Sequence, residues 1–185
     1  MTAPHWLPDI IQFGDYGGDW NRYLEVVYDC FRQDFKGSHR QLTFRDKPVR
    51  TSYHPAYENK DYSFWHLIQE GEIEDERTPD FRRCERIGWI RAIIENADND
   101  VVRVWDNVRV RRRGNERRVL LWLNEEYLVV LGDRGTYWSL VTAYATDRTN
   151  RINKLRKEYE AYKNAGPATL AVTRAEYSFH TWWMS

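Results

Sequence analysis

The sequence predicts an α+β fold in which N-terminal helices are followed by an antiparallel β-meander and a C-terminal helix. Apolar residues recur at helical spacing over residues 19–36 and 79–97, and the period changes to two from residue 102 onward. Turns containing Gly, Asn or Asp separate the strand-like segments, and helical spacing returns after residue 147. Helices and strands that occupy separate parts of a chain are typical of the α+β class.

The 185 residues are expected to form one domain over residues 1–185. Residues 1–17 are expected to form a loop, and residues 166–185 an aromatic tail that packs back on the domain or meets a partner. Hydrophobic residues make up 42% of the chain, which is enough for a core, and the aromatic content of 15% excludes intrinsic disorder. The formal net charge is zero, so any anion-binding site must be local.

Capping residues mark the predicted helix ends. Asp19 is expected to begin the helix over residues 19–36, and Gly37 to end it. The Thr-Pro-Asp run at 78–80 predicts the start of the helix that reaches residue 97. Asp147 is expected to cap the last helix, which the Gly-Pro pair at 166–167 would end.

Strands are predicted both before and after the helix at 79–97. Two short strands are expected over residues 42–45 and 49–53, and a helical turn over residues 64–68. The meander is expected to contain two short pieces separated by a bend at residues 106–107, followed by three strands over residues 119–123, 127–131 and 137–145.

Several enzyme signatures are absent from the sequence. There is no glycine-rich phosphate loop, dinucleotide-binding loop or HExxH motif, so no cofactor and no metal are expected. The acidic run at residues 70–76 could bind a cation, although a solvated loop is the simpler interpretation. Cys30 and Cys84 are expected to be free thiols. No apolar run could cross a membrane, and the cytoplasm is the expected location.

An arginine falls on the apolar side of the predicted helix at 79–97. Ile87, Ile90 and Ile94 share one arc of the helix, and Arg83 lies within that arc. Because a buried guanidinium needs a partner, Arg83 forms either an internal salt bridge or an anion-binding site at the rim of the core. Three arginines within five positions, Arg82, Arg83 and Arg86, favour the anion-binding site.

The last predicted strand carries two hydroxyl groups. With a period of two, Trp138, Leu140, Thr142 and Tyr144 share one face, which runs from a core-like end to a polar end. A hydroxyl and a phenol side by side can hydrogen-bond a phosphate and stabilise a transition state. Thr and Tyr are also common strand residues, so a structural role is the simpler interpretation.

Histidine is the usual acid or base near neutral pH, and two histidines lie in the middle of the chain. His66 follows an aromatic pair and precedes two apolar residues, so it is expected beside the core. His54 precedes Pro55 and is expected on a surface turn.

A strongly basic segment surrounds a predicted hairpin turn, and it could bind an RNA backbone or an acidic partner such as an antitoxin or inhibitor. A solvated hairpin tip is an equally good interpretation. Its arginines are Arg109, Arg111, Arg112, Arg113, Arg117 and Arg118.

Four segments together resemble the phage-linked members of the barnase/EndoU/colicin/RelE-like nuclease superfamily, over roughly residues 50–160. They are Lys60-Asp-Tyr-Ser-Phe-Trp-His66-Leu, Arg77-Thr-Pro-Asp-Phe-Arg-Arg-Cys-Glu-Arg-Ile-Gly-Trp89, Tyr127-Leu-Val-Val-Leu131 and Leu140-Val-Thr-Ala-Tyr144.

The resemblance implies metal-free RNA cleavage, in which the ribose 2′-hydroxyl attacks the neighbouring phosphate and leaves a 2′,3′-cyclic phosphate. It makes His66 the acid or base, Arg83 or Arg86 the phosphate clamp, and Thr142 and Tyr144 the hydroxyls on the last strand. EndoU-like members carry two closely spaced histidines and a lysine, to which only His54, His66 and the intervening Lys60 could correspond.

The first hypothesis is therefore a metal-independent endoribonuclease, of toxin or phage-defence type, that acts on single-stranded or tRNA-like RNA. The alternative is a non-enzymatic inhibitor or adaptor that binds through the arginine hairpin and the aromatic tail. A small metal-dependent hydrolase is a third and weaker hypothesis.

Overall fold

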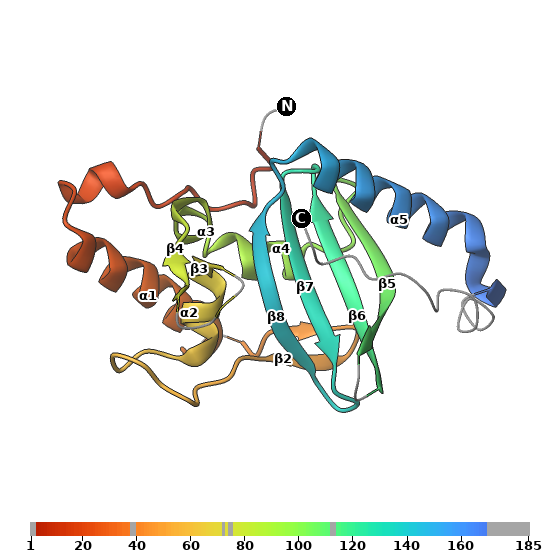
Figure 1. Cartoon of the computed structure of the whole chain (residues 1–185), viewed down its shortest axis with the longest axis horizontal. Coiled ribbons are helices and arrows are strands. Elements are labelled where there is room, and N and C mark those ends of the chain that lie inside the picture. Colours follow the sequence, from red (N-terminus) through yellow and green to blue (C-terminus); the bar gives the residue numbers. More distant parts are fainter. Residues whose placement is uncertain (1–2, 38–39, 72, 74–75, 112–113, 170–185) are drawn as a thin grey trace.

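The structure is a computed structural model, and it describes residues 3–37, 40–71, 73, 76–111 and 114–169. It confirms the α+β class, with helices before a meander and a helix after it (Figure 1). The helices are η1 (Phe13–Tyr16), α1 (Trp20–Lys36), α2 (Tyr62–Ile68), α3 (Phe81–Glu85), α4 (Trp89–Glu95) and α5 (Thr149–Thr169). The strands are β1 (Thr43–Phe44), β2 (Lys47–Arg50), β3 (Gln69–Glu70), β4 (Thr78–Pro79), β5 (Val102–Arg111), β6 (Gly114–Leu123), β7 (Tyr127–Asp133) and β8 (Trp138–Ala145).

The main sheet has six strands in the order β1-β2-β8-β7-β6-β5. The four strands β5 to β8 form the predicted antiparallel meander. The β1–β2 hairpin joins this meander through a short parallel pairing with β8, in which Val49 faces Trp138. The indole N–H of Trp138 donates to the carbonyl of Phe44 at 2.9 Å. The sheet is therefore mixed, which the sequence did not predict.

Each face of the sheet buries its own hydrophobic cluster. The first cluster includes Leu121, Val129 and Leu140 of the sheet and extends to α1, α2 and α4. The second includes Trp105, Trp122 and the α5 residue Leu155. Alternation along β6 and β7 produces both clusters, because successive side chains point to opposite faces. Figure 1 shows α5 crossing the meander. We call the side that carries the second cluster the α5 face.

The predicted helix over residues 79–97 is wrong in two respects. Thr78 and Pro79 form β4, and Asp80 is the N-cap, whose carboxylate accepts from the amide of Arg82. The helix is also interrupted between α3 and α4, near Gly88. A β-carbon at Gly88 would lie 3.2 Å from the sulfur of Cys30 on α1. The close approach of α1 explains why glycine suits this position.

The predicted bend at residues 106–107 is also wrong, because β5 is one strand of ten residues. Polar side chains are accommodated in this edge strand by partners from other elements. The carboxylate of Asp106 accepts from Arg45 of the β1–β2 turn and from the Tyr162 hydroxyl of α5. The Asn107 amide donates to Glu158 of α5 at 3.1 Å.

A β-bulge in β8 changes which side chains share a face. Val130 pairs with Thr142 and Leu131 with Leu140, so Val141 is an additional residue in β8. Leu140 and Ala143 therefore pack in the first cluster, whereas Val141 and Tyr144 pack on the second. The prediction that Trp138 and Leu140 share a face with Tyr144 was wrong, because one extra residue inverts the alternation.

Candidate functional site

Tyr144 lies after the bulge in β8, between arginines from two different helices. The guanidinium carbon of Arg83 on α3 lies 5.5 Å from the centre of the Tyr144 ring, and that of Arg151 on α5 lies 4.8 Å from it. Arg83 also donates to the carbonyl of Gln69 at 2.8 Å and lies 3.3 Å from the Asp80 carboxylate. Arg83 thus has internal partners and also contacts Tyr144. In the part of the chain that the structure describes, Arg151 makes no ion pair.

An ion pair brings α3 and the start of α5 together beside this tyrosine. The guanidinium of Arg82 binds the carboxylate of Asp147. Asp147 was expected to cap α5, but the helix begins at Thr149, and the amide N–H of Ile152 donates a hydrogen bond to the carbonyl of Arg148. The carboxylate of Asp147 therefore connects two helices, and this connection places Arg83 and Arg151 beside the same end of β8.

Two titratable groups on the α5 face hold their protons more strongly than usual. Burial raises the pKa of the Tyr144 phenol, and the nearby Arg151 and Arg83 oppose this shift without cancelling it. Burial also raises the pKa of the Glu158 carboxyl. The charge on Glu158 contributes to the raised pKa of Tyr144, so the two side chains are electrostatically coupled. Displaced pKa values are a feature of functional sites.

The α5 face continues from Tyr144 toward the hairpin tips. Thr142 precedes Tyr144 by two residues and shares its face. The charge of Arg118 on β6 also lowers the pKa of Tyr144 slightly. The same guanidinium donates two hydrogen bonds, of 3.0 and 2.7 Å, to Glu116. Arg118 thus lies between Tyr144 and the Glu116 carboxylate.

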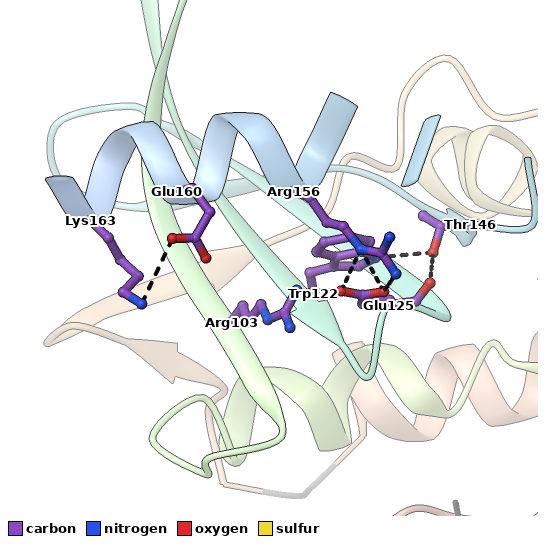
Figure 2. Close-up of polar contacts among 7 residues, drawn as sticks. All are labelled: Arg103, Trp122, Glu125, Thr146, Arg156, Glu160 and Lys163. Carbon is purple, nitrogen blue, oxygen red and sulfur yellow. Dashed lines mark hydrogen bonds and ion pairs between the residues drawn. The ribbon is translucent and has the colours of Figure 1, made fainter. Parts of the chain in front are cut away.

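A polar network fixes α5 on the sheet next to this site (Figure 2). Arg156 of α5 binds the carboxylate of Glu125, which lies in the β6–β7 turn and is also held by Arg103. The indole N–H of Trp122 donates to the Thr146 hydroxyl at 3.0 Å, and Thr146 donates to the carbonyl of Glu125. The position of Arg151 and Glu158 over the sheet depends on this attachment of α5.

His66 lies on α2 and has a defined hydrogen-bonding state. Its Nδ1 is 2.7 Å from Nη1 of Arg77, and its ring stacks on Tyr62 at 6.0 Å. A guanidinium only donates hydrogen bonds, so Nδ1 is the acceptor and the neutral ring carries its proton on Nε2. In this state Nε2 of His66 can donate a hydrogen bond, and Nδ1 is engaged by Arg77.

Three other predicted site residues have partners away from Tyr144. Arg86 pairs with Glu85 at 2.9 Å and lies over the ring of Trp89, on the side of the sheet that carries α4. Lys60 is buried and pairs with a glutamate of α1 at 2.6 Å. His54 is exposed, and its ring packs against the neighbouring tyrosine.

The arginine hairpin divides between the two faces of the sheet. Arg109 pairs across the ladder with Glu116, and Arg118 lies on the same face as both. Arg117 is exposed and points to the opposite face. Arg112 and Arg113 lie outside the described residues, as does the side chain of Arg111 and the predicted tail over residues 170–185.

Sequence reasoning missed Arg151 and Glu158. They lie seven residues apart on the predicted C-terminal helix, which places both on the same side of it. That spacing, together with Ile152, Leu155 and Tyr159, was the available signal. It could not indicate which strands the helix would cross.

Comparison with family models, curated proteins and solved structures finds no match to this chain. Among the described residues, no three His, Cys, Asp or Glu side chains form a group that could hold a metal ion. No helix in the described part of the chain is long and apolar enough to cross a membrane.

Proposed function

We propose that the chain is a metal-independent endoribonuclease whose reacting phosphate binds beside Tyr144. The observation that carries the proposal is that Arg83 and Arg151, which come from two different helices, both lie over the ring of Tyr144. Cleavage by 2′-hydroxyl attack needs a base, an acid and positive charge near the phosphate. The α5 face carries a group suited to each requirement.

Glu158 is the proposed base and Tyr144 the proposed acid. The carboxylate of Glu158 takes the proton of the 2′-hydroxyl, and its raised pKa makes it a stronger base than an ordinary carboxylate. The phenol of Tyr144, like any tyrosine, is protonated at neutral pH, and it donates that proton to the leaving 5′-oxygen. Arg83 and Arg151 stabilise the charge on the non-bridging oxygens, and the products are a 2′,3′-cyclic phosphate and a 5′-hydroxyl.

Cleavage of a fluorogenic single-stranded RNA by the purified full chain, in buffer containing EDTA, tests this proposal. Tyr144→Phe and Glu158→Gln are each expected to lower kcat by roughly 10²–10⁴-fold, the usual contribution of an acid or base. Tyr159→Phe is the matched control, because Tyr159 lies on the same face and its hydroxyl makes no hydrogen bond with the described residues. Full activity in both site variants, or activity that requires added magnesium or manganese, would overturn the proposal.

A non-enzymatic binding role is the second candidate, and exposed apolar side chains favour it. Val108 and Val110 of β5 are 46% and 66% exposed, beside the exposed Arg117. Paired valines next to an arginine suit an acidic protein such as an antitoxin or inhibitor. A chain that cleaves no RNA, and whose expression in a bacterium is harmless, would favour this candidate. The cellular target proposed for the enzyme is cytoplasmic single-stranded or tRNA-like RNA.

A further inference from the structure

A groove lies between the tips of two hairpins, at the end of the sheet away from α5, and residues from both faces of the sheet line it. It is a cavity of about 490 Å³, lined by residues 114–117 at the start of β6 and by residues 133–135 in the β7–β8 turn. Residues 114–117 and 133–135 lie far apart in the sequence. The pairing of β6 with β7 brings them together.

One carboxylate positions the guanidiniums at this groove. The Glu116 side chain is only 10% exposed and accepts from Arg118 and, at 2.9 Å, from Arg134. Arg109 faces Glu116 directly across the ladder. A carboxylate that is shared by several arginines neutralises only one of them, so positive charge remains.

The other charges at the groove do not balance this excess. Asp133 is already paired with Lys47 at 3.1 Å. Arg117 is exposed, and within the described residues it has no ion pair. Arg134 is 44% exposed, so donors of its guanidinium remain open to solvent. The side chains that line the cavity thus include two carboxylates, each already ion-paired, and two arginines, both of which are exposed to solvent.

Three glycines shape the groove, two by leaving its rim free of side chains and one by allowing a close contact in its wall. Gly114 and Gly135 have φ angles of +116° and +80°, and a β-carbon at either position would meet only open space. Gly132 forms the adjacent wall. A β-carbon there would lie 3.3 Å from Oε1 of Glu116 and 3.1 Å from a methyl group of Val141, which is the bulged residue of β8. Because residue 132 has no side chain, the Glu116 carboxylate and the Arg134 guanidinium can lie in contact above β7.

We infer that this groove is a second phosphate-binding site, which holds the backbone of the RNA strand at a distance from the reacting phosphate. The inference rests on the proposed function for the identity of the strand. Asp133 and Leu128 of β7, which pair with Trp138 and Tyr144, are five residues apart, so the groove lies about 17 Å from the tyrosine at a rise of roughly 3.3 Å per residue. Arg118 lies between the two sites. A strand of several nucleotides could contact both, whereas a dinucleotide could not.

A purely structural ion-pair network is the simpler explanation of Glu116 and Arg134, and it makes a different prediction. A structural network would require Arg134 for stability and would give Arg117 no role. A phosphate site requires both guanidiniums for binding. Arg117→Gln is therefore the decisive variant, because it removes a charge without breaking an ion pair among the described residues.

The test is the binding of fluorescein-labelled 2′-O-methyl RNA, measured by fluorescence anisotropy over a range of salt concentrations. The probe cannot be cleaved, because its 2′-oxygen is blocked. For an octamer, Arg117→Gln with Arg134→Gln is expected to weaken binding about tenfold or more and to reduce the slope of log K against log salt by roughly 1.4, at about 0.7 per lost phosphate contact. Arg117→Gln alone is expected to give about half of this reduction in slope. A dinucleotide should bind both variants like the wild type.

Arg32→Gln is the control, because this exposed arginine on α1 lies on another element and pairs only with Asp29 among the described residues. An octamer that binds the double variant with wild-type affinity and salt slope overturns the second site, even if the wild type cleaves RNA. Arginine-dependent binding by a chain that does not cleave unmodified RNA supports the second site and overturns the proposed enzyme. A wild-type chain that does not bind the octamer overturns the second site.

Discussion

Asp34 on α1 is a carboxylate whose surroundings favour its neutral form. Burial raises its pKa to about 6, Arg91 opposes the shift, and Glu95 adds to it. One of its carboxylate oxygens is buried and has no hydrogen-bond partner among the described residues. Between about pH 4 and 6 the native state therefore holds a proton that the unfolded chain, with an ordinary aspartate pKa of 3.8, has already released. Stability from this group is complete below about pH 4 and is lost as the pH rises through about 6.

We predict that Asp34→Asn stabilises the protein at pH 8 by about 1–2 kcal/mol and has little effect at pH 4. This range is smaller than the free energy that corresponds to the full pKa shift of Asp34, because the side chain is partly exposed to solvent. Urea unfolding of both chains at the two pH values would measure it. Asp29→Asn on the exposed side of the same helix is the control and should change stability by less than about 0.5 kcal/mol at either pH. A constant difference between wild type and Asp34→Asn would contradict the pKa argument.

At the scale of single residues, the sequence could identify Arg83 and Tyr144 as candidates, and the structure brings them together. The period of a helix places an arginine on an apolar arc, and the period of a strand places a hydroxyl near the end of a face. Neither pattern indicates how close the helix and the strand lie in the folded chain. Arg151 and Glu158 come from a helix whose crossing direction depends on packing, so their relation to Tyr144 could not be predicted.

At the scale of elements, α1 and the meander followed the sequence pattern, and the departures have local causes. The amphipathic spacing and Asp19 cap predicted α1 closely. The interruption near Gly88 and the bulge at Val141 were not predicted, because the adjacent residues keep an uninterrupted apolar pattern. Both irregularities arise from contacts with distant elements, and single-sequence periodicity does not record such contacts.

The attachment of α5 gives a prediction at this scale. Hydrogen bonds from Arg156, helped by Arg103, lower the pKa of Glu125 to about 2 against the effect of burial. The native state therefore favours the carboxylate, so this stability is present above the unfolded pKa of about 4.5 and is lost as the pH falls through 2. Glu125→Gln is expected to destabilise the protein by about 1 kcal/mol at pH 7, because Arg156 is half exposed and the pair is partly screened.

Glu160→Gln is the matched control on α5. The Glu160–Lys163 pair in Figure 2 has a separation of 3.9 Å, and both side chains are 56% exposed. Its loss should change stability by less than about 0.5 kcal/mol. Chemical denaturation at pH 7 and pH 3 would compare the variants. Equal effects of the two substitutions at pH 7 would show that Glu125 does not anchor α5.

At the scale of the whole molecule, one sheet separates two hydrophobic clusters. Every strand of the meander contributes to both, because alternate side chains point to opposite faces. The strands predicted at 119–123 and 127–131 are apolar at successive positions, as is typical of central strands, and this agrees with burial on both faces. The sequence did not predict that the β1–β2 hairpin would extend the sheet, since two short strands carry little pattern of their own.

The shared strands predict that the two clusters unfold together. Leu155→Ala removes a buried side chain of the second cluster, and Ile90→Ala removes one of the first. Each is expected to cost about 2–5 kcal/mol, the usual range for truncation of a buried aliphatic side chain. Urea unfolding would be followed by far-ultraviolet circular dichroism and by tryptophan fluorescence, to which Trp105 and Trp122 contribute from the α5 face. Both variants should shift a single transition that the two signals report alike. If Leu155→Ala instead produces an early transition of its own, α5 detaches independently, and Arg151 and Glu158 would be lost from Tyr144 while the rest of the fold persists.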